Sequence, residues 1–121
     1  MDEHEELAEW LDKIKKNKIL VIVEGKNDKL ALAEFGIKRV KTLTRRAIYN
    51  VVEETAKVCK KAIILTDLDK EGKKLFRMLN NGLSQNGVYV DKRFRNFLFK
   101  ETKLRQIEGL ARYAKRLKNK H

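Results

Sequence analysis

Apolar residues along this chain follow two alternating patterns. Short runs rich in aliphatic and β-branched residues, bounded by charged or turn-forming residues, predict four buried strands. These strands are expected at residues 19–23, 39–43, 62–66 and 87–91. Elsewhere, apolar residues recur at three- and four-residue spacing, which indicates amphipathic helices. The helices are expected at residues 2–16, 27–36, 70–83, 92–99 and 102–117, with one more around Val51.

Capping and turn residues suggest where several of these helices begin and end. Thr44 is a candidate N-cap for the helix that contains Val51, because its hydroxyl can accept from a free backbone N–H. Gly36 is expected to end the second helix. The Asn80-Asn81-Gly82 sequence is a turn signal, and it is expected to close the helix that starts near Lys70.

Alternation of strands and helices predicts an α/β protein with a mostly parallel four-stranded sheet flanked by helices on both faces. The length of 121 residues suits one domain spanning residues 1–121. Its core is expected at about residues 18–91. An acidic N-terminal helix, 2–16, precedes this core, and basic C-terminal helices, 92–117, follow it.

The formal net charge of +12 is unevenly distributed. Residues 1–12 contain six acidic and no basic residues, whereas Lys92–Lys120 contains eleven basic and two acidic residues. Such a positive field attracts polyanions, so nucleic acid is the expected partner. A lysine-rich solvated surface without a partner is the alternative interpretation.

Three further features concern the compartment. No apolar run approaches the ~20 residues of a membrane span, so no membrane partner is expected. The acidic N-terminus does not resemble a signal peptide. The single cysteine, Cys59, is interpreted as a packing residue and fits a reducing, cytoplasmic location.

Carboxylates occur where two of the predicted strands end. Glu24 follows the first strand, and Asp67 and Asp69 follow the third. Ligands of parallel sheets bind beyond the carboxyl ends of the strands, so these side chains are expected to converge if the two strands are neighbours. Close carboxylates repel one another unless a cation intervenes, and Mg²⁺ is a natural partner because it needs only one or two carboxylates and retains water.

The Asp67-x-Asp69 sequence has other interpretations. A calcium loop would need a glutamate at its twelfth position, where this chain has Met78. Phosphatases of the haloacid dehalogenase type also carry D-x-D after a strand, but they leave the VEGKND sequence at 23–28 without a role. A simple polar turn would explain one acidic motif and not both.

Both motifs together resemble the two signatures of the Toprim domain, which occurs in topoisomerases, bacterial-type primases, nucleases and recombination proteins. ILVIVEGKNDKLAL matches the first signature through Glu24, Gly25 and Asp28, and AIILTDLDKEGKKL matches the second through Asp67, Asp69 and Gly72. The resemblance covers about residues 18–91. It is greatest to small stand-alone archaeal Toprim proteins and to the Toprim part of the bacterial 5S ribosomal RNA maturation nuclease.

The resemblance implies a compact Rossmann-like fold and a role for each matched residue. Asp67 and Asp69 are expected to hold Mg²⁺, or alternatively Mn²⁺, and Glu24 either joins them or acts as general acid or base. Gly25 is expected to allow a tight turn and close backbone approach. Asp28 is expected to support the site or cap the following helix, and Gly72 to open a helix whose N-terminus suits an anion.

Basic residues supply the expected nucleic-acid contacts, which are Lys26, Lys70, Lys73, Arg95 and Arg112. RNA is favoured over DNA. Two functions remain open at this point: a magnesium-dependent nuclease or other phosphodiester-processing enzyme, and a non-catalytic module that uses the metal as a bridge to phosphate. No separate nucleophile is evident, since Tyr49, Tyr89 and Tyr113 qualify only by residue type.

Overall fold

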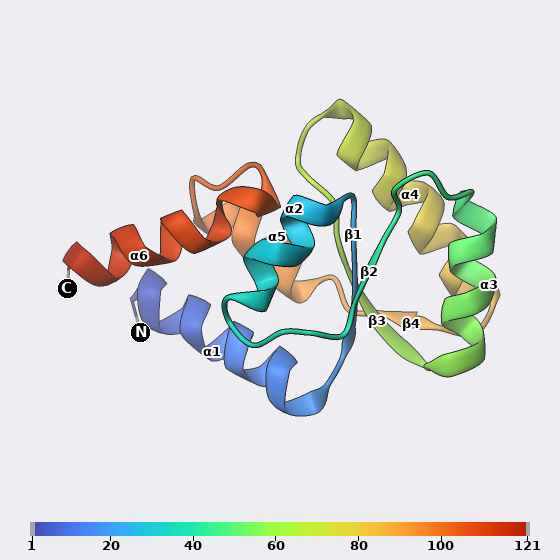
Figure 1. The fold of residues 1–121 in the computed structure, drawn as a ribbon, viewed down its shortest axis with the longest axis horizontal. Coiled ribbons are helices and arrows are strands. Elements are labelled where there is room, and N and C mark those ends of the chain that lie inside the picture. The colour runs from blue at the N-terminus through green and yellow to red at the C-terminus, as the bar shows by residue number, and fades with distance from the viewer. Residues whose placement is uncertain (1, 121) are drawn as a thin grey trace.

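Four parallel strands form the centre of the molecule. The computed structural model describes residues 2–120, with side chains up to residue 116. The strands are β1 (Leu20–Val23), β2 (Val40–Thr42), β3 (Lys61–Leu65) and β4 (Tyr89–Val90). Their order in the sheet is β2-β1-β3-β4, and every pair is parallel (Figure 1). The predicted α/β class and four-stranded sheet are therefore confirmed.

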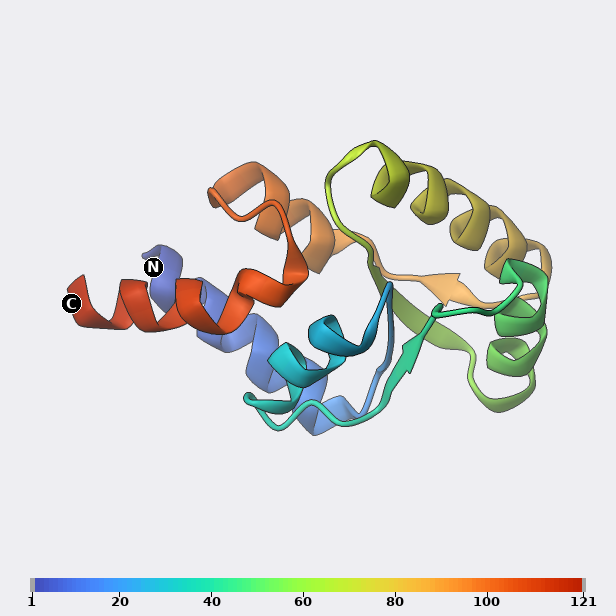
Figure 2. The same cartoon turned by 45° about the horizontal axis from the view of Figure 1, so that its top comes forward.

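Helices cover both faces of this sheet. They are α1 (Glu3–Asn17), α2 (Lys26–Ala33), α3 (Ile48–Val58), α4 (Lys70–Gln85), α5 (Arg93–Glu101) and α6 (Leu110–Lys120), with a 3₁₀ turn, η1 (Ile107–Gly109), before α6. Helices α3 and α4 lie together on one side of the sheet, and α1, α2, α5 and α6 lie on the other (Figures 1 and 2). No helix within residues 2–120 is long and apolar enough to cross a membrane.

Alternation along the strands divides the apolar core into two clusters, because successive strand side chains point to opposite faces. Val21, Val23 and Ile63 pack with the residues of α1, α2, α5 and η1. Ile22 and Ile64 pack with those of α3 and α4. Since both faces are buried, the strands appear in the sequence as continuous apolar runs rather than as alternating ones.

The prediction that helix α4 ends at Asn80-Asn81-Gly82 is wrong, because α4 continues to Gln85. Gly82 lies where α4 packs against α3, and a Cβ atom at this position would lie 2.9 Å from Cγ2 of Val52. Gly82 therefore allows close approach of two helices. In the sequence this glycine was interpreted as a turn signal, because glycine occurs both in turns and where two helices pack closely.

Two other predicted boundaries are wrong. Helix α3 begins at Ile48 with Ala47 at the cap position, and Thr44 instead donates a hydrogen bond to the carbonyl oxygen of Glu24 at 3.4 Å. The expected helix 102–117 begins only at Leu110. The Thr102 hydroxyl donates to Leu98 O and accepts from the N–H of Leu104, so it ends α5 and starts an irregular loop.

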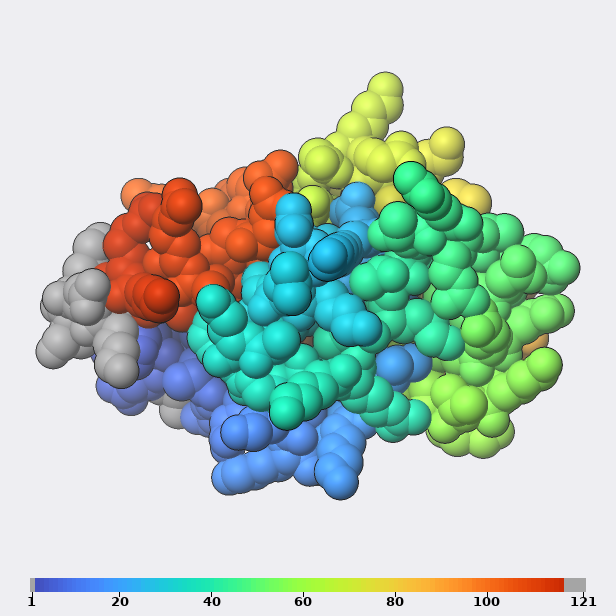
Figure 3. Space-filling model, in the orientation of Figure 1, coloured from blue at the N-terminus to red at the C-terminus, as the bar shows by residue number. Residues whose placement is uncertain are grey.

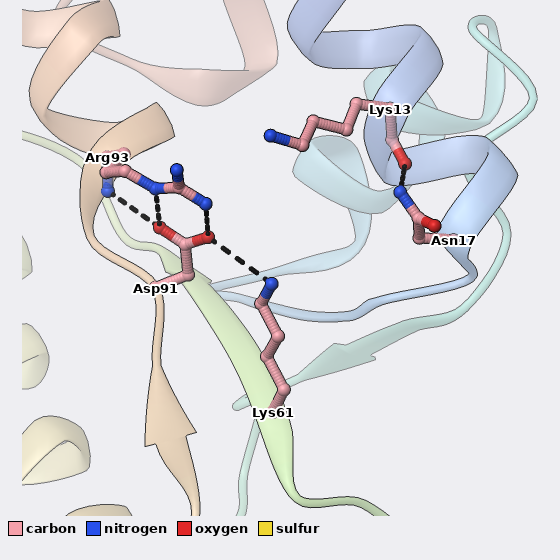
Figure 4. A network of polar contacts seen from close by, with 5 residues as sticks. All are labelled: Lys13, Asn17, Lys61, Asp91 and Arg93. Atoms are coloured by element: carbon pink, nitrogen blue, oxygen red, sulfur yellow. Dashed lines mark hydrogen bonds and ion pairs between the residues drawn. The ribbon is translucent and has the colours of Figure 1, made fainter.

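Asp91, the residue after β4, forms the most deeply buried ion pairs among the described residues. Its side chain is 3% exposed and accepts from Arg93 Nε at 3.0 Å and Arg93 Nη2 at 2.8 Å, with Lys61 Nζ at 3.7 Å (Figure 4). It also accepts from the backbone N–H of Arg93, at the start of α5. The bonds from Arg93 lower the pKa of the Asp91 carboxyl to about 2, and Lys61 contributes in the same direction.

Replacing Asp91 with asparagine is expected to lower the free energy of unfolding by about 2 kcal/mol at pH 7, because the pKa falls from 3.8 to about 2 on folding. A depressed folded-state pKa stabilises the protein above the unfolded value, and this contribution is lost as pH falls from about 4 to about 2. The free energies of unfolding of wild type and Asp91→Asn, measured in urea, should therefore differ above pH 4 and converge near pH 2.

Asp12→Asn, in an exposed pair with Lys16, is the matched control with little expected effect. A stability difference for Asp91→Asn that does not change with pH would contradict the assignment.

Candidate metal centre and nucleic-acid interface

The candidate site lies at the carboxyl ends of β1 and β3. These strands are neighbours with Val23 opposite Leu65, so the residues that follow them emerge side by side. Glu24 comes directly after β1, and the loop of residues 66–69 comes after β3 and leads into α4 (Figure 2). The strand pairing thus brings together two motifs that are more than forty residues apart in sequence.

Glu24 contacts the second motif directly. Its Oε2 atom accepts a hydrogen bond from the backbone N–H of Asp67 at 2.6 Å. Burial raises the pKa of the Glu24 carboxyl, and this hydrogen bond opposes the rise, while the charges of Asp67, Asp69 and Asp28 add to it. The three aspartates are therefore close enough for their charges to act on Glu24.

Asp67 is half-buried and bonded to a distant segment of the chain. Its Oδ1 atom accepts from the backbone N–H of Ile107 at 2.8 Å. Burial raises the pKa of the Asp67 carboxyl. The Ile107 bond lowers that pKa, the Asp69 and Glu108 charges raise it, and the Arg95 charge lowers it. Asp67 thus belongs to a cluster of acidic side chains, and the buried guanidinium of Arg95 is close enough for its charge to act on it.

Asp69 is exposed and caps helix α4, since its Oδ1 atom accepts from the N–H of Gly72 at 2.7 Å. Gly72 is required here for steric reasons, because a Cβ atom would lie 2.1 Å from the carbonyl oxygen of Asp67. The Thr66 hydroxyl also donates to Gly72 O at 2.8 Å. The first turn of α4 is therefore packed tightly against the Asp67 loop.

Asp28 and Gly25 of the first motif lie together at the start of α2. Asp28 Oδ2 accepts from the N–H of Gly25 at 3.0 Å, so Asp28 closes the start of α2, one of its two expected roles. The chain bends at Glu24 and Gly25 between β1 and α2, as expected, but Gly25 has φ −148°, an extended conformation open to any residue, so the bend does not require glycine. A Cβ at Gly25 would meet only Thr44 Oγ1, at 3.8 Å, and the surface at Gly25 is open to close approach.

The donor set at this edge fits a hard divalent cation. Each of Glu24, Asp67 and Asp69 uses one carboxylate oxygen to accept from a backbone N–H. Within the described residues, the other oxygen of each accepts no hydrogen bond from protein. No group of three or more Asp, Glu, His or Cys side chains among the described residues is placed so that it could hold a metal ion. Mg²⁺ needs only one or two carboxylates because it retains several waters, so the free oxygens are suitable ligands for it by their chemistry.

The expected position of Arg95 on the outer basic surface is wrong. Arg95 is 8% exposed, and its guanidinium donates to the carbonyl oxygens of Thr66, at 3.2 Å, and Asp67, at 3.0 Å. It also lies over the rings of Phe76 and Phe99, with 4.5 and 5.1 Å from Cζ to the ring centroids. Helix α5 turns Arg95 inward among apolar neighbours, an orientation that charge alone does not predict. This residue is thus not available to bind a phosphate backbone.

The other candidate basic residues, Lys26, Lys70, Lys73 and Arg112, are exposed. Lys26 begins α2 and Lys70 begins α4, and both therefore lie at the edge where the acidic group is found. Arg112 lies on α6. It lines an open groove of about 840 Å³ that starts at Leu68 and Asp69 and continues between the loop 103–106 and α6.

The groove is lined by both basic and acidic residues. Lys103, Arg105, Arg112 and Arg116 line it together with Glu3, Glu101 and Asp69. The Glu3 carboxylate accepts a hydrogen bond from Tyr113, whose pKa burial and this bond raise to about 12. In Figure 3, the orange-to-red surface of the C-terminal segment borders the lime-coloured residues that follow β3.

Sequence reasoning missed the contribution of residues 105–108. The N–H of Leu68 donates to Arg105 O at 3.0 Å, Ile107 donates to Asp67, and Glu108 acts on Asp67 through its charge. The two hydrogen bonds use main-chain groups of Arg105 and Ile107, which lie in a loop and in the turn η1 rather than in the expected continuous helix. The available signal was Thr102, a residue that can end a helix by local hydrogen bonding.

The fold and site together define an α/β protein of the doubly wound type, with an acidic group beyond the carboxyl ends of two central parallel strands. The sequence model of the Toprim domain matches residues 19–92, and this chain belongs to the Toprim family. Toprim domains generally bind divalent metal ions and take part in nucleic-acid processing.

Several relatives are small archaeal proteins. The chain is 32% identical over 119 residues to a UPF0292 protein of Methanosarcina acetivorans, with 96% of this chain and 83% of the relative covered. It is 30% identical over 115 residues to a UPF0292 protein of Methanocaldococcus jannaschii, with 90% of each covered. These matches extend beyond the Toprim core into both terminal segments.

Two solved structures from Aquifex aeolicus have the same fold. A putative protein is 39% identical with a TM-score of 0.78, covering 84% of this chain and 95% of that one. The zinc-binding and RNA polymerase domains of a primase are 24% identical with a TM-score of 0.61, covering 91% of this chain and 26% of that one. The resemblance to the primase establishes fold alone.

Proposed function

We propose that this protein binds nucleic acid through a divalent cation at Glu24, Asp67 and Asp69 and processes phosphodiesters, with RNA as the favoured substrate. The observation that carries the proposal is the hydrogen bond from the Asp67 N–H to Glu24, which joins the two acidic motifs at one edge of the sheet. The preference for RNA rests on the resemblance to the Toprim part of the 5S ribosomal RNA maturation nuclease.

Each carboxylate has a distinct part in this proposal. Asp67 and Asp69 would hold Mg²⁺ or Mn²⁺, which supplies charge stabilisation for a phosphodiester during in-line displacement. Glu24 would hold or accept a proton at its free oxygen, since its raised pKa suits general acid–base chemistry. Lys26, Lys70 and Lys73 would contact phosphate oxygens beside this edge.

A nucleic-acid strand would run along the groove beside Asp69. This groove is open, has a volume of about 840 Å³, and is lined by the basic residues Lys103, Arg105, Arg112 and Arg116. Arginines along α6 would contact the phosphates that flank the reacting one. The groove therefore provides a path from the acidic group along the C-terminal segment.

Incubation of the pure protein with labelled structured RNA, single-stranded DNA and duplex DNA tests the proposal. Each polymer is incubated with Mg²⁺, with Mn²⁺ or with a chelator. We expect cleavage of RNA that requires the metal and stops with the chelator. Cleavage that persists in chelator would contradict the metal dependence, and preferential cleavage of DNA would contradict the substrate preference.

A non-catalytic role is the second candidate, because the sequence offers no evident separate nucleophile. Tyr49 and Tyr89 are exposed, and the Tyr113 hydroxyl is bonded to Glu3. In this role the cation bridges the carboxylates to a phosphate without cleavage. Nucleic acid that is retarded in a gel yet intact after incubation with metal would favour this candidate.

Salt dependence provides a prediction for the groove. The double variant Arg112→Gln, Arg116→Gln should weaken binding to many sequences alike and flatten the plot of log affinity against log salt by about one to two units, at about 0.7 per lost contact to a single strand. The matched control is Lys57→Gln, Lys60→Gln, at the α3 end of the molecule (Figure 1). Equal slopes for wild type and the α6 variant would show that these arginines are only solvated.

A further inference from the structure

The loop that carries Asp67 is held on one side by residues of the C-terminal segment. Arg95 donates to Thr66 O and Asp67 O, the Ile107 N–H donates to Asp67 Oδ1, and Arg105 O accepts from the N–H of Leu68. All three residues from the C-terminal segment lie beyond residues 19–92, the part that matches the Toprim domain. The candidate site thus includes contacts that the family core does not supply.

We propose that Arg95 and the backbone N–H of Ile107 are positioning groups, which hold the Asp67 carboxylate in the orientation that a divalent cation requires. The C-terminal segment, residues 95–107, is then part of the metal centre rather than an appendage to it. This inference rests on the proposed function, because it concerns the same carboxylates and the same cation.

Arg95 is suited to this role by its surroundings. A buried guanidinium is costly unless its donors are satisfied, and here they bond two successive backbone carbonyls of the loop. The rings of Phe76, on α4, and Phe99, on α5, flank the guanidinium and restrict its movement. The loop backbone is thereby attached to two helices at once.

The charge of Arg95 adds a second effect. It acts on both Glu24 and Asp67, whose carboxylates also repel one another. A fixed positive charge behind the loop offsets part of this repulsion without occupying the carboxylate oxygens, because Arg95 bonds the carbonyls instead. The carboxylates can then stay close together before a cation arrives.

The Ile107 N–H fixes one oxygen of Asp67 and leaves the other for a ligand. The Ile107 side chain is fully buried in the core, and its backbone begins η1, so the donor has a defined position. Such outer contacts orient metal-binding side chains, and their removal typically weakens metal affinity by about 10- to 100-fold. Ile107 would restrict the movement of the Asp67 carboxylate, and Arg95 would restrict the movement of the Asp67 main chain.

Two variants test the proposal through metal affinity rather than activity. Ile107→Pro removes the donor together with part of the buried side chain, and the backbone accepts proline because it fits the first position of a helical turn and Gln106 before it is extended, at φ −131° and ψ 133°. Ile107→Ala keeps the N–H and removes more of the buried side chain than proline does. Arg95→Lys keeps a positive charge but cannot bond both carbonyls in the same geometry.

Mn²⁺ affinity measured by proton relaxation, with urea unfolding of each folded variant alongside, gives the outcome. We expect Ile107→Pro and Arg95→Lys each to weaken Mn²⁺ binding by about 10-fold or more, and Ile107→Ala to retain wild-type affinity despite lower stability. Affinity that follows stability across all three variants, or wild-type affinity in Ile107→Pro and Arg95→Lys, would overturn the proposal. A wild-type protein that binds no Mn²⁺ would overturn the proposed metal site as well, which distinguishes the two failures.

Discussion

Replacement of Glu24 by glutamine is expected to reduce metal-dependent cleavage by roughly 10²- to 10⁴-fold, the usual contribution of general acid–base catalysis. The amide oxygen of glutamine can still accept from the Asp67 N–H, so the contact between the two motifs is retained. The titratable carboxyl is lost. Single-turnover cleavage of labelled RNA by wild type and Glu24→Gln measures the effect.

Nucleic-acid affinity should change far less than turnover in this variant, because the arginines and lysines that would contact phosphates are untouched. Glu53→Gln, an exposed substitution on α3, is the matched control and should cleave at the wild-type rate. Full turnover in Glu24→Gln would exclude a proton-transfer role for Glu24. If the wild type binds nucleic acid without cleaving it, the same variant should weaken metal affinity instead.

The double substitution Asp67→Asn, Asp69→Asn is expected to abolish binding of the divalent cation. Both amides retain an oxygen that can accept from Ile107 and Gly72, and asparagine is a good N-cap, so the loop and helix α4 should keep their structure. Only the charge that attracts the cation is removed. Calorimetry with Mg²⁺ and proton relaxation with Mn²⁺ measure the loss.

A control separates loss of charge at the site from loss of charge in general. Glu9→Gln with Asp12→Asn removes two negative charges from the exposed side of α1 and should leave metal affinity unchanged. Wild-type affinity in Asp67→Asn, Asp69→Asn would place the cation elsewhere in the molecule. The wild-type affinity itself should be weak, because two carboxylates leave most of the coordination to water.

The strands and the edge at which the acidic motifs meet were predictable from the sequence. Strands buried on both faces appear as apolar runs, and β1 and β3 are such runs. Parallel strands place their carboxyl ends at one edge, so the positions of Glu24 and Asp67 follow once β1 and β3 are neighbours. Local composition and a general rule of chain topology were sufficient here.

Predictions were wrong where one residue type serves two purposes. Gly82 resembled a helix end because glycine is frequent in turns, but it allows α3 and α4 to approach closely. Arg95 resembled a surface cation because arginine is usually exposed, but it lies beneath the Asp67 loop. In each case the sequence shows the residue type but does not show which residue lies next to it in space, and that neighbour determines its role.

The sequence by itself determined the α/β class, the order of elements, the two acidic motifs and the concentration of positive charge after residue 92. Each of these depends on residues close together in the chain, whose periodicity and composition can be read directly. Only the tertiary structure decided that Arg95 is buried, that Ile107 bonds Asp67 and that α6 borders a groove beside Asp69. The two hydrogen bonds join segments about 30 to 40 residues apart, and in each of them one partner is a backbone group that every residue possesses. No local pattern of side chains therefore specifies them.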